Sequence, residues 1–367
     1  MHEDRPSTAP DFLLSRATGS VRTQGARHTF NDADAAISAL RSKDVEMVVG
    51  AIPFDSDTPA ALTVPETIIR EEGPLEPHAY YRNQSLSSRV VGVDPEPEEH
   101  LRRVEAAIGT IETSKLEKVV LARAVDIEFP EAIDPRLVAA RLIDLSANRD
   151  GFIADLSPAG RPGAMLVGSS PEVLVKRQGS TVSAFPLAGS SPRRASAAED
   201  HLAGQDLLHS SKDLHEHAFV VDHLRRALTP LCERLDIPDV PQLISTNEMW
   251  HLGTPISGTL KDKDLTALEL ALEIHPTPAI CGTPAEAAQA LIETAETDRG
   301  FYAGAVGWCD SSGDGEYMVA IRCAEVAGDG LSARAWAGGG IVGDSDAHAE
   351  LEETTAKLRT ILKALSL

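Results

Sequence analysis

The last third of the chain, residues 301–357, constrains the fold more than any other stretch. Three apolar segments, at 303–309, 317–326 and 331–337, predict strands, and they are separated by residues 310–315 and 328–330, which are rich in turn formers. Strands joined by such short turns lie antiparallel. A glycine-rich stretch at 337–340 is expected to form a turn, and a closing helix whose N-cap could be Ser345 follows it. The region therefore predicts an antiparallel sheet beside a long helix.

Strand-like and helix-like patterns also follow one another upstream. Residues 118–129 predict a strand, and residues 172–177 and 181–185 predict a hairpin around Gln178-Gly179. Residues 210–231 carry apolar side chains at spacings of three and four, which predicts an amphipathic helix. Further helices are expected at 32–40, after 95–98 and at 134–147, further strands at 45–52 and 164–168, and a loop-rich surface at 65–97. Hairpins mixed with long helices are typical of an α+β fold.

Composition narrows the class of partner. A chain of 367 residues can form one large domain or two smaller ones. Its net charge of −22 argues against nucleic acid or an anionic membrane, because both require a basic surface. No stretch approaches the ~18 apolar residues of a membrane span, and residues 1–16 lack a signal-peptide core. The four cysteines have no CxxC spacing. These features predict a cytoplasmic protein.

Two expected helices each carry a pair of acids on one face. Asp213 and Glu216 are three residues apart, and so are Glu350 and Glu353, with Lys357 four residues further on. Two such pairs could hold a hard divalent cation together with water and a ligand oxygen. Each pair alone is equally consistent with a solvated helix surface. A zinc site at residues 215–217 is not expected, because side chains two apart on a helix point in different directions.

Three further features have both a structural and a functional interpretation. The glycines at 338–340 precede a helix and could offer backbone N–H groups to an anion, or could form only a tight turn. Lys118 opens an apolar strand and could be a catalytic base in a dry cleft or a lysine that protects a sheet edge. His251 could belong to the core or to a site. The residues alone thus predict an acidic α+β protein with a candidate divalent-cation site.

Nine segments, in one order, resemble the chorismate-utilising enzymes, and among them the isochorismate synthases most closely. They are KVVLARAV (118–125), SSPEVLV (169–175), FPLAGSSPR (185–193), SKDLHEHAFVVDHLR (211–225), MWHLGTPISG (249–258), EIHPTPAICGTP (273–284), DRGFYAGAVGWCD (298–310), GEYMVAIRCAEV (315–326) and AGGGIVGDSDAHAELEETTAKL (337–358). The resemblance implies one chorismate-binding domain over residues 1–367, with a variable part at 1–110 and a motif-bearing part at 111–367. It implies an α+β fold of two large, mostly antiparallel sheets packed together, with helices outside.

The resemblance also implies a Mg²⁺-dependent isomerisation of chorismate. Water adds to the ring carbon beside the one that bears the carboxylate, the double bonds shift, and the ring hydroxyl leaves from the other end of the diene. In this family the matching positions make Lys118 the base and Glu172 the acid, with His251 beside the departing hydroxyl. Glu216 and Glu353 resemble the Mg²⁺ ligands, and Asp213 and Glu350 the residues that hold metal-bound water.

The remaining implied site residues bind substrate. Arg322 and Lys357 resemble the partners of the enolpyruvyl carboxylate, aided by the amides of Gly338 and Gly340, and Gly189 lies against the ring carboxylate. The matching positions also include Ser190, Thr254, Ala279 and Tyr302. A dianion can bind to a protein of charge −22 because local charges dominate within a Debye length of about 8 Å.

Several related activities remain open. Anthranilate synthases lack a lysine at the position of Lys118 and usually depend on a glutaminase, so water is the expected nucleophile and no glutaminase subunit is expected. Salicylate synthases, the alternative, tend to carry threonine where this chain has Ala279. Aminodeoxychorismate-type enzymes and a non-catalytic sensor or scaffold are further alternatives, and a sensor would not need Lys118 and Glu172. A monomer is expected, with isochorismate feeding siderophore or menaquinone synthesis.

Overall fold

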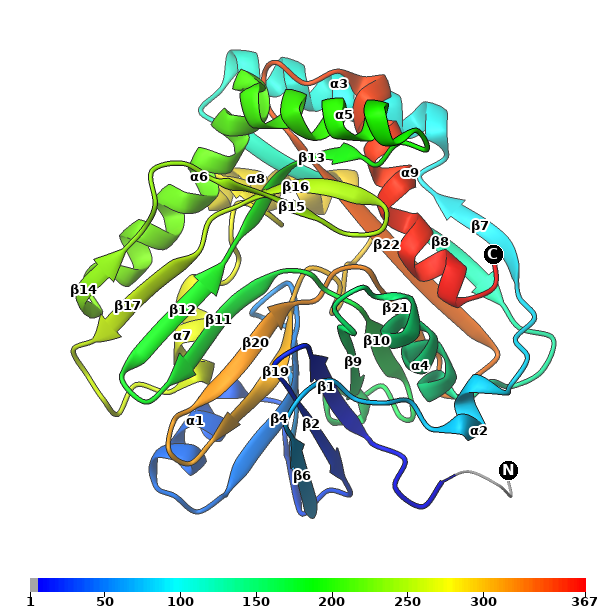
Figure 1. Ribbon diagram of the computed structural model, residues 1–367, viewed down its shortest axis with the longest axis vertical. Helices are drawn as coiled ribbons and strands as arrows, with labels where there is room; N and C mark the ends of the chain where they lie inside the picture. Colours follow the sequence, from blue (N-terminus) through cyan, green and yellow to red (C-terminus); the bar gives the residue numbers. More distant parts are fainter. Residues whose placement is uncertain (1–5) are drawn as a thin grey trace.

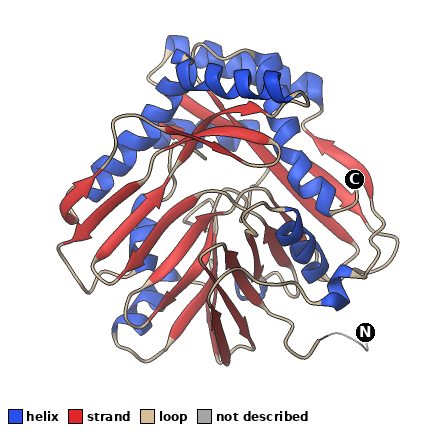
Figure 2. Ribbon diagram, viewed as in Figure 1, coloured by secondary structure: helices blue, strands red, loops and turns tan. Residues whose placement is uncertain are grey.

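The structure, a computed structural model, describes residues 6–367. Of the N-terminal segment 1–16, residues 1–5 lie outside the described part. Two large sheets and one small sheet make up the framework, and every strand pairing given for the described residues is antiparallel. The predicted α+β class and its two large antiparallel sheets are confirmed (Figure 2).

The first large sheet has ten strands. Its order is β18 (Gly282–Thr283), β8 (Lys118–Glu128), β22 (Ser332–Ile341), β21 (Cys323–Val326), β10 (Met165–Gly168), β9 (Gly151–Asp155), β1 (Phe12–Arg16), β2 (Gly19–Gln24) and β6 (Thr67–Glu71), and β7 (Arg89–Asp94) also pairs with β8. The second has nine: β14 (Cys232–Asp236), β17 (Ile256–Leu260), β12 (Thr181–Phe185), β11 (Val173–Gln178), β20 (Gly315–Val319), β19 (Ala305–Asp310), β4 (Met47–Ile52), β5 (Ala61–Val64) and β3 (His28–Phe30). The third contains β13 (Leu187–Pro192), β16 (Met249–Gly253) and β15 (Gln242–Ser245).

Helices cover the outer surfaces of these sheets (Figure 1). They are α1 (Ala33–Arg41), α2 (Ala79–Arg82), α3 (Pro97–Thr113), α4 (Pro135–Leu145), α5 (Ala197–His209), α6 (Ser211–Leu228), α7 (Ala267–Ile274), α8 (Ala285–Ala295) and α9 (Ala347–Ala364). Helix α9 packs on β22, α6 on β13, α7 on β19 and β20, and α8 on β8. Among the described residues, no helix is both long enough and apolar enough to cross a membrane.

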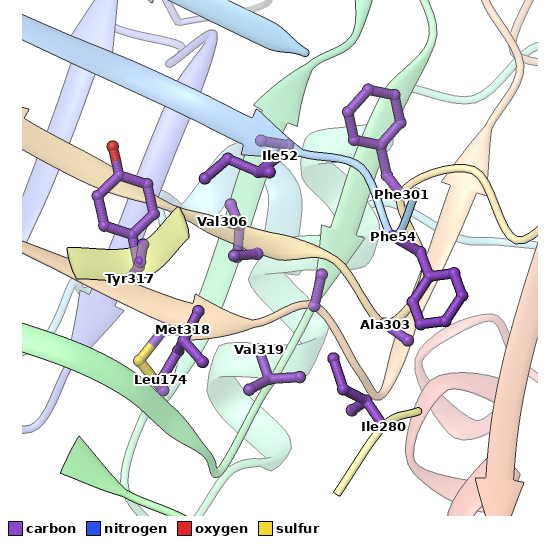
Figure 3. Packing of buried hydrophobic residues seen from close by; sticks show 14 of the residues in the cluster. Ile52, Phe54, Leu174, Ile280, Phe301, Ala303, Val306, Tyr317, Met318 and Val319 are labelled. Carbon is purple, nitrogen blue, oxygen red and sulfur yellow. The ribbon is translucent and has the colours of Figure 1, made fainter. Parts of the chain in front are cut away.

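The main hydrophobic cluster includes side chains from both large sheets. Figure 3 shows part of it, where Val319 of β20 lies beside Ile280, which also forms part of the wall of a cleft, and Val306 of β19 and Met318 of β20 belong to the same cluster. A second cluster fills the space between the ten-stranded sheet and helices α4 and α9. Strand β8 is buried along almost its whole length because both of its faces are covered, which explains its continuous apolar sequence.

The sequence-based prediction was wrong about the segment 317–326. One strand was expected there, but the chain forms β20, leaves the nine-stranded sheet, and enters the ten-stranded sheet as β21. Arg322 lies at this crossing with φ of +52°, a left-handed conformation that no extended strand contains. The apolar pattern is continuous across the crossing because residues on both sides of it are buried, so hydrophobicity gives no sign of the break.

The expected glycine turn at 337–340 is also absent. Gly338, Gly339 and Gly340 belong to strand β22 and pair with Ala122, Leu121 and Val120 of β8. The following helix α9 begins after Asp346, whose carboxylate accepts a hydrogen bond from the Ala349 N–H, and not after Ser345 as expected.

The N-terminal hundred residues contribute more regular structure than the prolines suggested. Strands β1, β2 and β6 extend the ten-stranded sheet beyond β9, while β3, β4 and β5 extend the nine-stranded sheet beyond β19. The expected loop-rich stretch 65–97 contains β6, α2 and β7. The predictions of a helix at 32–40, a strand at 45–52 and a helix after 95–98 are confirmed.

Candidate active site

A cleft opens where strands pass from one sheet to another. About 610 Å³ of space outside protein atoms lies within it, and part of this space is open to solvent. Its walls come from the ten-stranded and three-stranded sheets, from segments that connect strands, and from helices α6 and α9. The predicted site residues that line it are Glu172, Gly189, Ser190, Glu216, His251, Ala279, Tyr302, Arg322, Gly338, Gly340 and Lys357.

Two neighbouring crossings bring Glu172 and Arg322 to this cleft. The chain passes from β10 to β11 through residues 169–172, and from β20 to β21 through residues 320–322. The crossings are hydrogen-bonded to each other, since the Ser169 N–H donates to the Arg322 carbonyl at 3.1 Å and the Val319 N–H donates to the Glu172 carbonyl at 3.1 Å. A carboxyl group and a guanidinium far apart in sequence are thereby held on one wall.

Glu172 is a buried carboxyl group in this wall, with 3% of its surface exposed. Burial raises its pKa to about 7, although the Leu187 N–H and the charges of Lys118, Lys357 and Arg322 act in the opposite direction. The Leu187 N–H donates to Glu172 Oε1 at 3.4 Å. A carboxyl group with this pKa is partly protonated at neutral pH and can donate a proton to a leaving group.

Lys118 lies at the start of β8 and is completely buried. Its ammonium group forms an ion pair with Glu216 of α6, with Nζ 3.0 Å from Oε1. This contact requires a glycine on the neighbouring strand β22, because a Cβ at Gly340 would lie 2.1 Å from Glu216 Oε1 and 3.0 Å from Lys118 Cε. Gly340 therefore allows the ion pair to lie against β22.

His251 connects the three-stranded sheet to Arg322. Arg322 Nη2 donates to His251 Nε2 at 3.2 Å, which leaves the proton on Nδ1 to be donated to Ser190 Oγ at 2.8 Å. Burial, together with the charges of Arg322 and Lys357, holds the pKa of His251 well below its usual value. His251 is thus a neutral imidazole in a fixed tautomer.

Positive charge is available in the cleft for an anion. Arg322 is buried, and none of the ion pairs among the described residues joins it to a carboxylate. Lys357 Nζ donates to the Gly338 carbonyl at 2.9 Å and pairs with Glu353 Oε1 at 2.6 Å.

Tyr302 lies against the glycines of β22. Its ring stacks on Trp336 of β22 with 5.7 Å between ring centroids, and a Cβ at Gly338 would lie 2.8 Å from the Tyr302 hydroxyl oxygen. The glycines of β22 thus leave room for polar groups.

The four predicted metal-binding acids lie in one region, but each of them contacts a lysine. Besides the pairs of Glu216 and Glu353, Lys212 Nζ is 2.8 Å from Glu350 Oε1 and 3.7 Å from Asp213 Oδ1. Over residues 6–367, no set of three or more His, Cys, Asp or Glu side chains is arranged to hold a metal ion. The predicted ligands are therefore near one another without forming a completed coordination shell.

The chemistry of these acids nevertheless fits a hard divalent cation. Asp213 Oδ1 and Glu350 Oε2 are buried with no hydrogen-bond partner in the described part of the chain. Burial and the neighbouring charge of Glu353 raise the pKa of Glu350 to about 7, and burial raises the pKa of Asp213. Carboxylate oxygens are donors that Mg²⁺ prefers, and a bound cation would offset the repulsion between neighbouring carboxylates.

Five predicted site residues are not among those that line the cleft: Lys118, Asp213, Thr254, Glu350 and Glu353. Thr254 is held by a neighbouring histidine. Its hydroxyl forms a hydrogen bond of 2.7 Å with Nε2 of His217, and Nδ1 of His217 donates to the Ala188 carbonyl at 3.0 Å. Burial lowers the pKa of His217 to about 4. Sequence reasoning considered His217 only as a zinc ligand, whereas in the structure it fixes α6, which carries Glu216, to the backbone beside Gly189. Gly189 itself has φ of +78°, and a Cβ there would lie 3.1 Å from Asp213.

The sequence-based prediction did not identify Lys212 as a residue of the site. Its only signal in the sequence is its place beside Asp213, in the first turn of α6. The apolar residues of the cleft wall that were not anticipated include Val120, Leu187 and Ile321. Periodicity places such residues in a core and cannot indicate that they face a ligand.

Comparison with known proteins places this site in a family. Residues 41–366 match the family model described as "Chorismate binding enzyme". The MenF protein of Mycobacterium tuberculosis is 45% identical, over 97% of this chain and 96% of its own length. Isochorismate synthase DhbC of Bacillus subtilis is 44% identical, over 87% of this chain and 80% of its own. The crystal structure of Bacillus anthracis DhbC superimposes with a TM-score of 0.90 at 37% identity, covering 100% of this chain and 98% of that one. The chain belongs to the chorismate-binding enzyme family, as its motifs predicted.

Proposed function

We propose that this enzyme is an isochorismate synthase, which converts chorismate to isochorismate. The observation that carries the proposal is Glu172, a buried carboxyl group with a pKa of about 7 in a cleft that also contains buried cations. The relative from Bacillus subtilis bears the same activity in its name. Lys118 supports water as the nucleophile, as expected from its motif.

In the proposed reaction, Arg322 and Lys357 bind and orient the enolpyruvyl carboxylate of the substrate. Lys118 in its neutral form accepts a proton from water as the water oxygen bonds to the ring carbon beside the carboxylate-bearing carbon. The double bonds shift, the bond from the ring to the hydroxyl at the other end of the diene breaks, and Glu172 gives that hydroxyl its proton. One water enters and one leaves, so the product is an isomer of the substrate.

Glu216 and Glu353 would hold Mg²⁺, with Asp213 and Glu350 around its water molecules. When bound, the ion supplies a positive charge that grips the ring carboxylate and draws electrons from the ring. His251 stays neutral and keeps Arg322 and Ser190 in place through the two hydrogen bonds of its ring. Burial of Glu172 and Lys118 excludes bulk water, which strengthens their electrostatic interactions.

The activity is tested by incubating purified protein with chorismate and either Mg²⁺ or EDTA, followed by chromatography. Isochorismate formed only with Mg²⁺ supports the proposal. Salicylate together with pyruvate would favour a salicylate synthase, the alternative against which the small side chain of Ala279 argues. No product in either reaction would favour a non-catalytic sensor or scaffold.

We further propose that the enzyme acts in the cytoplasm as a monomer, without a glutaminase subunit. The sequence features behind this are the net charge of −22, which argues against an anionic membrane as partner, and Lys118, whose presence favours water over ammonia as the nucleophile. The product would feed siderophore or menaquinone synthesis.

A further inference from the structure

A cluster of acids and lysines lies beside the cleft, and of its members only Glu216 and Lys357 line the cleft wall. Four carboxylates, of Asp213, Glu216, Glu350 and Glu353, share Lys118, Lys212 and Lys357. We propose that Lys212 is an internal cation that balances Glu350 and Asp213 and is displaced when a divalent cation binds, so that it sets the metal affinity of the cleft. This inference rests on the proposed function only in taking these carboxylates as the metal site.

Glu350 shows why an internal cation is needed. It is 1% exposed, and a carboxylate buried to that extent without a counter-charge destabilises a protein strongly. Lys212 Nζ, 2.8 Å from Glu350 Oε1, provides the charge from the first turn of α6. Because Glu350 belongs to α9, the ion pair also connects the two helices that carry the acids.

Of the three lysines, Lys212 has the most freedom to move away. The side chain of Lys118 is 0% exposed, and that of Lys357 is 15% exposed and also bonded to the Gly338 carbonyl. The side chain of Lys212 is 24% exposed, so its ammonium group can reach water by rotation of its own side chain. Lys118 and Lys357 also have roles toward the substrate, whereas Lys212 has none in the proposed reaction.

Shared oxygens support the exchange. Lys212 Nζ lies 2.8 Å from Glu350 Oε1 and 3.7 Å from Asp213 Oδ1, and these are the two carboxylates that would surround the ion's water molecules in the proposed function. Lys212 and an incoming divalent cation would therefore compete for the same oxygens, and two cations held close together in a largely buried place repel each other.

The first test compares Mg²⁺ binding to EDTA-treated, dialysed wild type and Lys212→Gln by isothermal titration calorimetry. Loss of the competing cation should tighten Mg²⁺ binding about tenfold, since one unit charge near the site is removed. The same variant should unfold at a lower temperature in EDTA. Lys363→Gln is the matched control, because it removes the 3.1 Å ion pair between Lys363 of α9 and Glu248 with the same change in charge, and its Mg²⁺ affinity should equal that of wild type. Weaker or unchanged binding in Lys212→Gln would overturn the proposal.

A second test detects the displacement itself, and it does not need a variant that folds. Wild type is treated briefly with an acetylating reagent, with and without saturating Mg²⁺, and modified lysines are quantified by mass spectrometry. Acetylation of Lys212 should rise several-fold with Mg²⁺, while that of Lys363 should not change. If Mg²⁺ binds and Lys212 reacts no faster, the displacement is refuted and the proposed function stands. If wild type binds no Mg²⁺, both proposals fail.

Discussion

Glu172 and Lys118 are both enclosed by protein, and their surroundings differ in a way that suits opposite roles. Glu172 contacts a backbone N–H and no cation at ion-pair distance within the described residues, so burial dominates and its pKa rises to about 7. Lys118 lies 3.0 Å from Glu216, a contact that a bound metal ion would compete for. Side-chain environment, and not residue type alone, therefore separates the acid from the base.

The raised pKa of Glu172 predicts a pH dependence. Its protonated form donates the proton, so kcat/KM should fall as the pH rises through about 7. A pH profile of isochorismate formation under limiting chorismate measures this. Glu172→Gln should lose most activity, and what remains should lack the fall near pH 7. A wild-type profile that stays flat from pH 6 to 8.5 would contradict the assignment.

Replacement of the base should separate chemistry from binding. Lys118→Ala should abolish isomerisation while chorismate and Mg²⁺ binding remain measurable by calorimetry. Removing one member of a buried ion pair destabilises a protein by about 3–5 kcal/mol, so circular dichroism must first show that the variant is folded. Turnover close to that of wild type would exclude Lys118 as the base.

Ala279 offers a test of product specificity. Its side chain lines the cleft, and the corresponding position tends to be threonine in salicylate synthases. Ala279→Thr should form some salicylate and pyruvate, detected by fluorescence and by a coupled pyruvate assay. Ala279→Ser is a smaller control with the same kind of hydroxyl. Isochorismate as the sole product of both variants would move the distinction to another residue.

At the level of single residues, motif resemblance located most of the cleft wall. It could not assign charge partners, because these depend on which helix turn faces which strand. Lys212 beside Asp213 had no distinguishing pattern, and the hydroxyl of Thr254 turned out to bond to His217. Contacts between segments 138 residues apart, such as Lys212 and Glu350, have no local signature in the sequence.

Among the elements, strand β22 contains glycines that leave room for side chains from neighbouring elements. Their missing side chains allow Glu216, Lys118 and Tyr302 to approach one face, while Gly339 faces Glu350 and Thr354 of α9. Three successive glycines are poor strand formers and are normally found in turns, which is why a turn was predicted. Pairing with β8 along ten residues outweighs that low propensity.

Gly340→Ala is the prediction for this element. The added Cβ would lie 2.1 Å from Glu216 Oε1, so Glu216 must move and its contact with Lys118 must change. We expect kcat to fall about a hundredfold, with weaker Mg²⁺ binding and an unchanged circular dichroism spectrum. Gly343→Ala is the control, because its Cβ would meet no atom closer than 3.8 Å. Equal activity of the two variants would show that the close approach is unimportant.

Long elements with a clear period were predictable, and their interruptions were not. Helices α3 and α6 and strand β8 follow their apolar patterns closely. The change of sheet between β20 and β21 depends on the left-handed backbone of Arg322, which a run of buried residues cannot reveal. Because the cleft lies at such crossings, its position was the part of the fold hardest to infer from periodicity.

For the whole molecule, metal binding should be visible as stability. A ligand that binds only the folded protein at a hundred times its Kd stabilises it by about 2.7 kcal/mol. Mg²⁺ should therefore raise the unfolding temperature by a few degrees relative to EDTA, as measured by calorimetry. The EDTA sample is brought to the same ionic strength with NaCl. Any remaining difference in unfolding temperature then reports Mg²⁺ binding and not general screening of the net charge of −22. Glu353→Gln should lose most of the increase, and an equal increase in that variant would remove Glu353 from the metal site.

The two crossings next to Ser169 and Arg322 give the cleft a mechanical property. Glu172 and Arg322 lie on segments that join the nine-stranded sheet to the ten-stranded sheet, whereas Lys118 belongs to the ten-stranded sheet alone. Sliding of one sheet over the other would therefore change the separation of acid and base. The packed interior, which includes Val306 and Met318, resists such sliding (Figure 3). The stiffness of the core therefore limits how much the distance between Glu172 and Lys118 can vary.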